Sequence, residues 1–141
     1  MQLTELEDRI QIHDLFVRYT FAVDSWDEPA ILACFTEDGV LETPVLGGRF
    51  AGREGQREFV RVGRSRAEGS QIRHLFSNLG VQLAGDRATA QSYFVVYASR
   101  NGKTELSVVG RYNCRVRKLG ADWLFEYRGV SIDSRQEKPE R

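Results

Sequence analysis

The sequence of 141 residues predicts an α+β fold, in which helices pack on one face of a curved antiparallel sheet. Apolar residues recur at helical spacing before Gln71, whereas from Gln71 onward they alternate with polar residues as strands do. Turn dipeptides such as Asn101-Gly102 separate the strand-like runs, and turns this short make neighbouring strands antiparallel.

Three helices are expected ahead of the main sheet. The first covers about residues 4–23 and begins at the capping box Thr4-x-x-Glu7. A second begins at Asp27, whose side chain can cap a helix start. The third covers about residues 54–67 and is basic and amphipathic, with Phe59 and Val60 on its buried side. The buried face of the first helix is expected to carry Leu6, Ile10, Ile12, Leu15, Phe16, Tyr19 and Val23.

A short strand is expected at about residues 40–43, ending at Pro44 and a turn at Gly47-Gly48. The four long strands are expected at about residues 71–84, 87–100, 104–118 and 122–133. Residues 1–133 therefore form a single domain, and residues 134–141 form a polar C-terminal tail.

Both faces of the predicted strands carry bulky apolar residues, as Tyr93, Phe94, Val95 and Val96 do in one strand. A sheet that is apolar on both faces is usually covered on both. We therefore expect a homodimer through the open face of the sheet. The alternative is an ordinary exposed face with a few stray aromatic residues.

The composition excludes several classes of protein. The formal net charge is 0 and the pI is about 6.7, so the positive field needed for nucleic-acid binding is missing. No apolar run has the roughly 18–20 residues that would cross a bilayer, and the acidic N-terminal sequence is not typical of a secretory signal. Cys34 and Cys114 have no metal-ligand spacing, so we expect reduced cysteines, no metal, no cofactor and a cytoplasmic location.

Two histidines are present, and only one has an apolar setting. His13 lies among polar residues of the first helix and is expected to be solvated. His74 lies on the same face of a predicted strand as the apolar residues Ile72 and Phe76. Its ring nitrogens therefore need hydrogen-bond partners. It is either a core histidine bonded to a carbonyl or a general base in a pocket. Asp24 ends the first helix, where its charge is unfavourable unless a donor holds it; it either helps cap the next helix or accepts from His74.

Three further side chains are candidates for the same site. Arg128 either faces inward to stabilise an anion or pairs with an acid such as Glu126. Tyr19 lies on the apolar stripe of the first helix, either as a core tyrosine or as an oxyanion donor. Asn78 shares the parity of His74 and lines the same cavity if no bulge intervenes.

Taken together, these residues resemble a known family. The helix pattern Ile-x-x-Leu-Phe-x-Arg-Tyr-x-x-Ala-x-Asp is followed by Phe35-Thr36-Glu37-Asp38-Gly39-Val40 and Gly52-Arg53-Glu54-Gly55. The second half adds His74-x-x-x-Asn78, Gly85-Asp86-Arg87-Ala88, Gly110-Arg111-Tyr112 and Gly120-x-x-Trp123-x-Phe125. Over about residues 5–133 this resembles the SnoaL-like branch of the nuclear transport factor 2-like superfamily.

The resemblance implies a cone: a strongly curved sheet wrapped around three helices and enclosing a deep apolar pocket. Asp24 and His74 match the Asp–His dyad of scytalone dehydratase and of the hexachlorocyclohexane dehydrochlorinase, and Arg128 matches the pocket arginine of the latter. Tyr19 replaces the helix lysine of the dehydrochlorinase and coincides with the oxyanion tyrosine of ketosteroid isomerase. The residues expected to bind substrate are Phe16, Asn78, Phe94, Tyr112 and Cys114.

These residues favour a cofactor-free lyase or isomerase of the dehydratase, cyclase or isomerase type. The dyad would remove a proton from a small apolar, aromatic or polyketide-like molecule, with Tyr19 and Arg128 stabilising negative charge. The alternatives are a non-catalytic small-molecule-binding protein and the small subunit of a ring-hydroxylating dioxygenase. A fold of this kind hosts many functions, so the site must decide between them.

Overall fold

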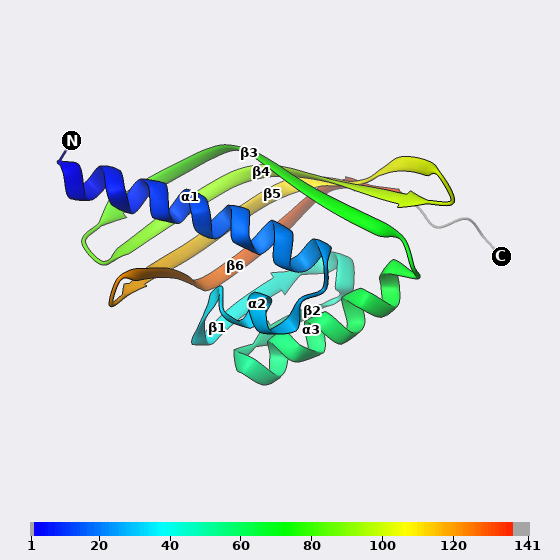
Figure 1. Cartoon of the computed structure of the whole chain (residues 1–141), viewed down its shortest axis with the longest axis horizontal. Helices are drawn as coiled ribbons and strands as arrows, with labels where there is room; N and C mark the ends of the chain where they lie inside the picture. The colour runs from blue at the N-terminus through cyan, green and yellow to red at the C-terminus, as the bar shows by residue number, and fades with distance from the viewer. Residues whose placement is uncertain (1, 137–141) are drawn as a thin grey trace.

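The computed structural model describes residues 2–136, which form three helices, a short 3₁₀ turn and a six-stranded sheet (Figure 1). The first half contains α1 (Leu3–Asp24), α2 (Glu28–Leu32), β1 (Phe35–Thr43), the 3₁₀ turn η1 (Pro44–Leu46), β2 (Gly48–Ala51) and α3 (Gly52–Ala67). The second half contains β3 (Gln71–Ala84), β4 (Arg87–Arg100), β5 (Lys103–Leu119) and β6 (Asp122–Arg135). The α+β class and the four long strands are confirmed.

The sheet has the strand order β2-β1-β6-β5-β4-β3. Strands β3 to β6 form an antiparallel meander, and β2 pairs antiparallel with β1. The pairing of β1 with β6 is parallel, so the sheet is mixed and not wholly antiparallel as expected. The expectation failed because β1 and β6 are far apart in the chain, and short turns fix the direction only of consecutive strands.

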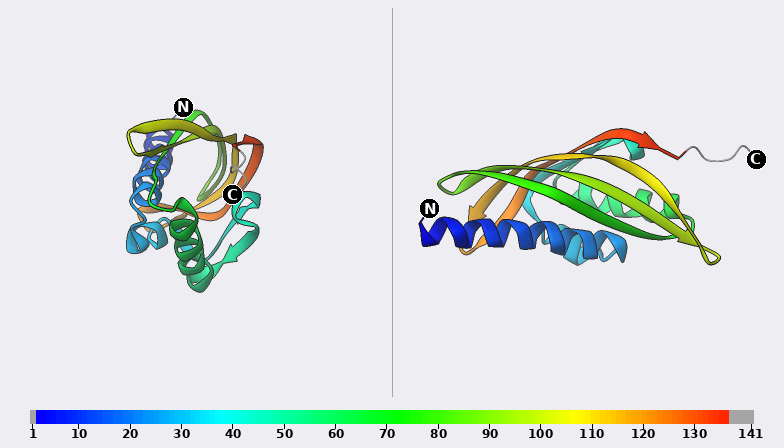
Figure 2. Two further views of the ribbon diagram at one scale, coloured as in Figure 1. Left: turned by 90° about the vertical axis from the view of Figure 1, so that its right-hand side faces the viewer. Right: turned by 90° about the horizontal axis from the view of Figure 1, so that it is seen from above.

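The long strands arch over α1, which runs along their concave side (Figure 2). Helix α3 packs against β1 and β2 at the other end of the sheet. Ile12, Leu15, Phe16, Tyr19 and Val23 of α1 are buried as expected. Leu6 and Ile10 are 46% and 54% exposed, because they lie on the outward face of the helix, together with the exposed His13 and Phe21, and not on the face that packs against the sheet.

Two local expectations for the first half of the chain need correction. The capping box of α1 uses Gln2 and Glu5 in place of Thr4 and Glu7, so the helix begins one residue earlier. The turn expected at Gly47-Gly48 connects β1 to β2, a strand that the short sequence Gly-Arg-Phe-Ala did not reveal. The Asp27 cap is confirmed, since its side chain accepts from the amide of Ala30.

Register shifts occur in four of the five strand pairs, and three of these shifts change which residues of the long strands face inward. In β3 the shift lies between Ser77 and Gly80, and in β6 it lies opposite Arg115 and Val116. A third shift lies between Val96 and Tyr97, opposite β5. A β-bulge adds an unpaired residue, so the inward-facing parity changes and the strand bends. These shifts contribute to the curvature of the sheet.

The convex face of the sheet carries an outer apolar patch on three adjacent strands. Its members are Leu75 on β3, Tyr93 and Tyr97 on β4, and Leu106 on β5, with exposures of 38% to 56%. Such a patch is unusual for a face that only meets water. None of the helices described within residues 2–136 has the length and apolar character needed to cross a bilayer.

The C-terminal tail was expected to begin at residue 134, which is too early. Ser134 and Arg135 still belong to β6 and pair with β5. Gln136 continues this contact, with its amide donating to the carbonyl of Ser107. The remainder of the expected tail, residues 137–141, lies outside the described residues.

Asp8 joins the start of α1 to the β5–β6 hairpin. Its Oδ1 accepts from Lys118 Nζ and from the indole Nε1 of Trp123, both at 3.0 Å. Burial by itself raises the pKa of Asp8, but the hydrogen bonds from Trp123 and Lys118 outweigh it and hold the pKa below its usual value. A lowered folded-state pKa means that this contact stabilises the fold above the unfolded-state value and weakens as the pH falls.

We predict that Asp8→Ala lowers the free energy of unfolding at pH 7 by about 1–3 kcal/mol, since it leaves the buried indole of Trp123 without its acceptor. The difference from the wild type should shrink below about pH 4, where the carboxyl is protonated in the unfolded chain. Urea unfolding at both pH values measures it. Asp14→Ala, at an exposed acid of the same helix, is the control, and equal effects of the two variants would contradict the prediction.

Candidate active site

Asp24, the last residue of α1, holds His74 of β3 through both its ring and its backbone. The imidazole Nδ1 lies 2.7 Å from Asp24 Oδ1. The backbone N–H of His74 also donates to Oδ1 and Oδ2, at 3.1 and 3.2 Å. The side chains of His74 and Asp24 are 16% and 10% exposed. Three contacts therefore fix one carboxylate against one histidine.

This geometry defines the hydrogen-bonding role of each ring nitrogen. An ionised carboxylate only accepts, so the Nδ1 atom of His74 carries the proton in the neutral ring. The second nitrogen, Nε2, then holds a lone pair. A ring with this tautomer can accept a proton at Nε2 while the carboxylate stabilises the resulting imidazolium.

The chain immediately after Asp24 keeps the end of α1 close to β3. Gln71 Nε2 donates to the backbone carbonyl of Asp24 at 2.9 Å. Trp26 has a left-handed backbone with φ of 51°, and Arg64 Nη2 donates to its carbonyl at 2.7 Å. The Trp26 ring occupies the space beside Gly63, where an added Cβ would lie 2.2 Å from it. Helix α3 therefore supports the turn that presents Asp24.

The inward-facing side chains of the concave face are partly exposed at the end that carries His74, which we call its open part. Inward-facing residues of β3 and β6 are half-buried there, whereas Tyr112, Cys114 and Arg128 are almost completely buried deeper in the fold. The half-buried set is Ile72, His74, Phe76, Val130 and Ile132. His74 therefore lies at the open part of the concave face, and Arg128 lies in its closed part.

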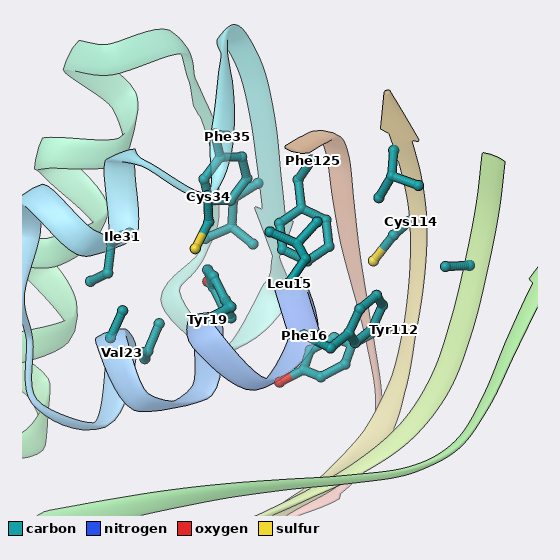
Figure 3. Packing of buried hydrophobic residues seen from close by; sticks show 14 of the residues in the cluster. Leu15, Phe16, Tyr19, Val23, Ile31, Cys34, Phe35, Tyr112, Cys114 and Phe125 are labelled. Atoms are coloured by element: carbon teal, nitrogen blue, oxygen red, sulfur yellow. The ribbon is translucent and has the colours of Figure 1, made fainter. Parts of the chain in front are cut away.

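Arg128 is a fully buried cation without an acidic partner among the described residues (exposure 0%). Its guanidinium carbon lies 3.7 Å from the ring centre of Tyr112 and 4.2 Å from that of Tyr19. Phe125 and Phe16 follow at 4.7 and 5.0 Å. Figure 3 shows these four rings packed together between α1 and the sheet.

One nitrogen of Arg128 has a partner and two have none. Nη1 donates to Cys114 Sγ at 3.6 Å, while Nε and Nη2 are buried and make no hydrogen bond. The expected alternative, an ion pair with Glu126, is not formed, because Glu126 contacts Arg87 and Arg117 on the other face. The register shift in β6 explains the difference, since it lets both Phe125 and Arg128 face inward.

A stacked aromatic pair lies between His74 and Arg128. Phe94 and Tyr112 are parallel, with ring centres 4.2 Å apart. Gly110 makes room for this pair, since a Cβ there would lie 2.9 Å from the Phe94 ring. Burial raises the pKa of the Tyr112 hydroxyl; the Arg128 cation opposes this shift, and the Asp24 carboxylate adds to it. Burial also raises the pKa values of Tyr19, Cys114 and Cys34, so these groups are neutral near pH 7.

Comparison with known proteins identifies the fold family. A family model described as a SnoaL-like domain matches residues 4–129. The chain belongs to the SnoaL-like family. No curated protein matches the chain in sequence.

Several solved structures share this architecture. Rv3472 of Mycobacterium tuberculosis, a protein of unknown function, is 28% identical over 92% of this chain and 74% of its own, with a TM-score of 0.82. An NTF2-like protein with a cystatin-like fold from Novosphingobium aromaticivorans is 27% identical over 93% and 85%, also with a TM-score of 0.82. A candidate scytalone dehydratase from the same species is 18% identical over 100% and 94%, with a TM-score of 0.82, and shows the fold alone.

Most residues predicted for the SnoaL-like site lie on or below the concave face, but Asn78 does not. It is exposed within the β3 bulge, with φ of 57°, and Leu79 takes the next inward position. The expectation that Asn78 lines the cavity is therefore wrong, because a bulge does intervene. His13 is exposed as expected, and its ring lies 5.5 Å from that of Phe76. Phe16, Tyr112 and Cys114 are buried and contact Arg128, and Phe94 is buried and stacks on Tyr112.

Several features of the concave face were not predicted from the sequence. Val130 and Ile132 share the parity of Arg128, which was the available signal for them. Ser92 of β4 has a buried Oγ without a partner, beside Tyr112 in the register. A hollow of about 480 Å³ lies beside Glu42, Asn113, Tyr127 and Val130, away from His74 and Arg128. No group of three or more His, Cys, Asp or Glu within residues 2–136 is arranged to hold a metal.

We predict that Arg128→Met changes the free energy of unfolding by no more than about 1 kcal/mol. The variant loses cation–π contacts worth about 2 kcal/mol, but it also removes the larger desolvation cost of a buried, unpaired cation. Phe125→Ala, at a neighbouring core residue, should cost about 3–5 kcal/mol and serves as the control. Urea unfolding compares them, and an equal loss in both variants would mean that Arg128 mainly stabilises the fold.

Proposed function

We propose that this SnoaL-like protein is a lyase or isomerase of the dehydratase, cyclase or isomerase type. His74 is the general base, and Asp24 orients it and compensates its charge. The substrate is a small apolar, aromatic or polyketide-like molecule with an activated C–H bond. Proton abstraction by an imidazole requires no metal or cofactor of its own.

The proposed step begins with transfer of the substrate proton to His74 Nε2. The electron pair of the broken C–H bond moves into an adjacent carbonyl, which gives an enolate, or expels a leaving group from the neighbouring carbon. Asp24 stabilises the imidazolium, which then returns the proton to the product or to the leaving group. Tyr19 and Arg128 stabilise negative charge at the end of the substrate that lies in the closed part of the concave face.

The single observation that carries this proposal is the 2.7 Å contact between His74 Nδ1 and Asp24 Oδ1 at the open part of the concave face. A histidine serving only the core would need no carboxylate on its ring and no exposure. Here the ring is oriented by a carboxylate, partly exposed and surrounded by apolar side chains. Those are the features that a general base for a C–H bond requires.

A second function, non-catalytic binding of a small molecule, is favoured by one observation. The part of the concave face around Tyr112 is filled with aromatic side chains, which leaves less space for a reaction. A small subunit of a ring-hydroxylating dioxygenase is a further alternative of this kind. Proton-exchange activity separates these functions, because neither alternative requires a base.

We predict that the wild type catalyses exchange of the acidic C–H protons of an aryl ketone such as 1-tetralone in D₂O. His74→Ala should lower the rate by about 10²-fold or more, which is the usual contribution of a positioned base. Asp24→Asn should also lose most of the rate, because the ring loses its charged acceptor. NMR of the ketone measures the exchange.

His13→Ala is the matched control, since it removes the exposed histidine of the described chain and should keep the wild-type rate. Circular dichroism establishes that each variant is folded. Wild-type exchange rates in folded His74→Ala and Asp24→Asn would contradict the proposed function and favour the binding protein.

We also propose that the protein is a homodimer through the outer apolar patch and that it acts in the cytoplasm. The patch has exposed side chains of up to 56% on three adjacent strands, which a second copy of the same face would cover. Both cysteines are free and buried, as in proteins of a reducing compartment.

We predict that Tyr93→Glu converts the dimer to a monomer, because it places a charge in the middle of an apolar interface. Thr89→Glu changes an exposed residue of the same strand outside the patch and should leave the dimer intact. Light scattering coupled to size-exclusion chromatography gives both masses. A wild type that is monomeric at about 100 μM would contradict the dimer, given that stable interfaces bind more tightly than this.

A further inference from the structure

We propose that the ligand of this site carries a carboxylate, which Arg128 binds through its Nε and Nη2 atoms. The inference deepens the proposed function by naming the substrate class of the same site: a flat aromatic carboxylic acid. It rests on the proposed function in one respect only, namely that the other end of the ligand faces His74. The proposed interaction with Arg128 is supported by the contacts of Arg128 itself.

Two of the three guanidinium nitrogens of Arg128 lack hydrogen-bond partners. Nη1 donates to Cys114 Sγ, and Nε and Nη2 make no hydrogen bond although both are buried. Nε and Nη2 form one side edge of the planar guanidinium, with two N–H bonds pointing in nearly the same direction. This edge matches the two oxygens of a carboxylate, which can accept both bonds at once.

The positive charge of Arg128 is not balanced by a nearby acid of the described chain. The Arg128 guanidinium stays protonated at every physiological pH, and no described Asp or Glu lies within ion-pair distance of it. Four aromatic rings and a neutral thiol surround it. A buried charge normally has a partner of opposite sign, because desolvating it alone is costly. A ligand that is already anionic when it binds supplies that charge, whereas a neutral ligand does not.

An aromatic layer lies between the base and the cation. In the register, the inward rows of His74 and Arg128 are separated by the row of Phe94 and the row of Tyr112. The stacked rings of Phe94 and Tyr112, both almost completely buried, form a flat aromatic layer between the two polar ends. Six residues of strand, about 20 Å, and three strand spacings, about 14 Å, separate the backbone positions of His74 and Arg128. The curvature of the sheet and the long Arg128 side chain shorten this span. A two-ring ligand covers more of this span than a one-ring ligand.

The two charges also fix the direction of the ligand. The Asp24 carboxylate raises the pKa of Tyr112, so its negative field reaches the stacked pair from the open end. The Arg128 cation lowers the same pKa from the closed end. A carboxylate is therefore attracted to Arg128 and repelled by Asp24, which leaves the opposite end of the ligand at His74. Ser92, with its unpartnered Oγ beside Tyr112, is available to a polar substituent in the middle.

The test compares an acid with its neutral amide of the same shape. Titration calorimetry at low salt measures the binding of 2-naphthoate and 2-naphthamide to the wild type. The acid should bind about tenfold more tightly or better, as expected for a charge-assisted double hydrogen bond. The preference should disappear in Arg128→Met and be reduced in Arg128→Lys, which keeps the charge without the paired N–H groups. Arg18→Met, at an exposed arginine of α1, should keep it.

A readout on the wild-type protein makes the test independent of how the variants fold. The side-chain Nε–H signal that disappears from the ¹H–¹⁵N spectrum of Arg128→Lys belongs to Arg128, and it should shift with naphthoate but not with naphthamide. Equal affinities for acid and amide, an acid preference that survives in Arg128→Met, or the absence of naphthoate binding at millimolar concentration would each overturn the inference. An identical shift with chloride alone would also overturn it, because a simple ion would then be enough to bind the Nε and Nη2 atoms of Arg128.

The outcomes separate this inference from the proposed function. His74→Ala should bind naphthoate as the wild type does, because the carboxylate end does not contact the base. If naphthoate binds selectively and His74→Ala keeps its exchange rate, the proposed function fails and the ligand class stands. If the His74 variant loses exchange while naphthoate and naphthamide bind equally, the ligand class fails and the proposed function stands.

Discussion

The contact between Asp24 and His74 connects the two halves of the fold. Asp24 ends the helix that fills the concave side of the sheet, and His74 lies on the edge strand β3. A carboxylate at the negative end of a helix is unfavourable alone, and here it is held by one ring nitrogen and one backbone amide. The same contact therefore positions α1 against β3, offsets the unfavourable charge, and sets the tautomer of the only inward-facing histidine of the described chain.

Arg128 gives the site its second charge. It lies in the closed part of the concave face, without an acidic partner in the described chain, while Asp24 lies in the open part. The Phe94–Tyr112 stack lies between them and responds to both, since the two charges move the pKa of Tyr112 in opposite directions. The interior thus has a polarity along its length, with a negative open end, an aromatic middle and a positive closed end.

Much of the fold could be predicted from the sequence, because periodicity and turn chemistry are local. The hairpin at Asn101-Gly102 has positive φ at both residues, as its sequence predicts, and the four long strands follow from such turns. The pairing of Asp24 with His74 could be proposed because each residue alone is unfavourable where it stands. The parallel β1–β6 pair and the bulges could not be predicted, since both depend on contacts between distant parts of the chain. Because of the bulges, the Arg128 side chain faces inward and the Asn78 side chain does not.

The most direct test of this account is the protonation pattern of the His74 ring, read from long-range ¹H–¹⁵N correlations at pH 8, where an ordinary imidazole is neutral. The account predicts a proton on Nδ1 and a lone pair on Nε2 for His74, and loss of this fixed pattern in Asp24→Ala. The exposed His13 ring provides an internal reference for a solvated histidine. A His74 ring protonated on Nε2, or one unchanged by Asp24→Ala, would contradict the account.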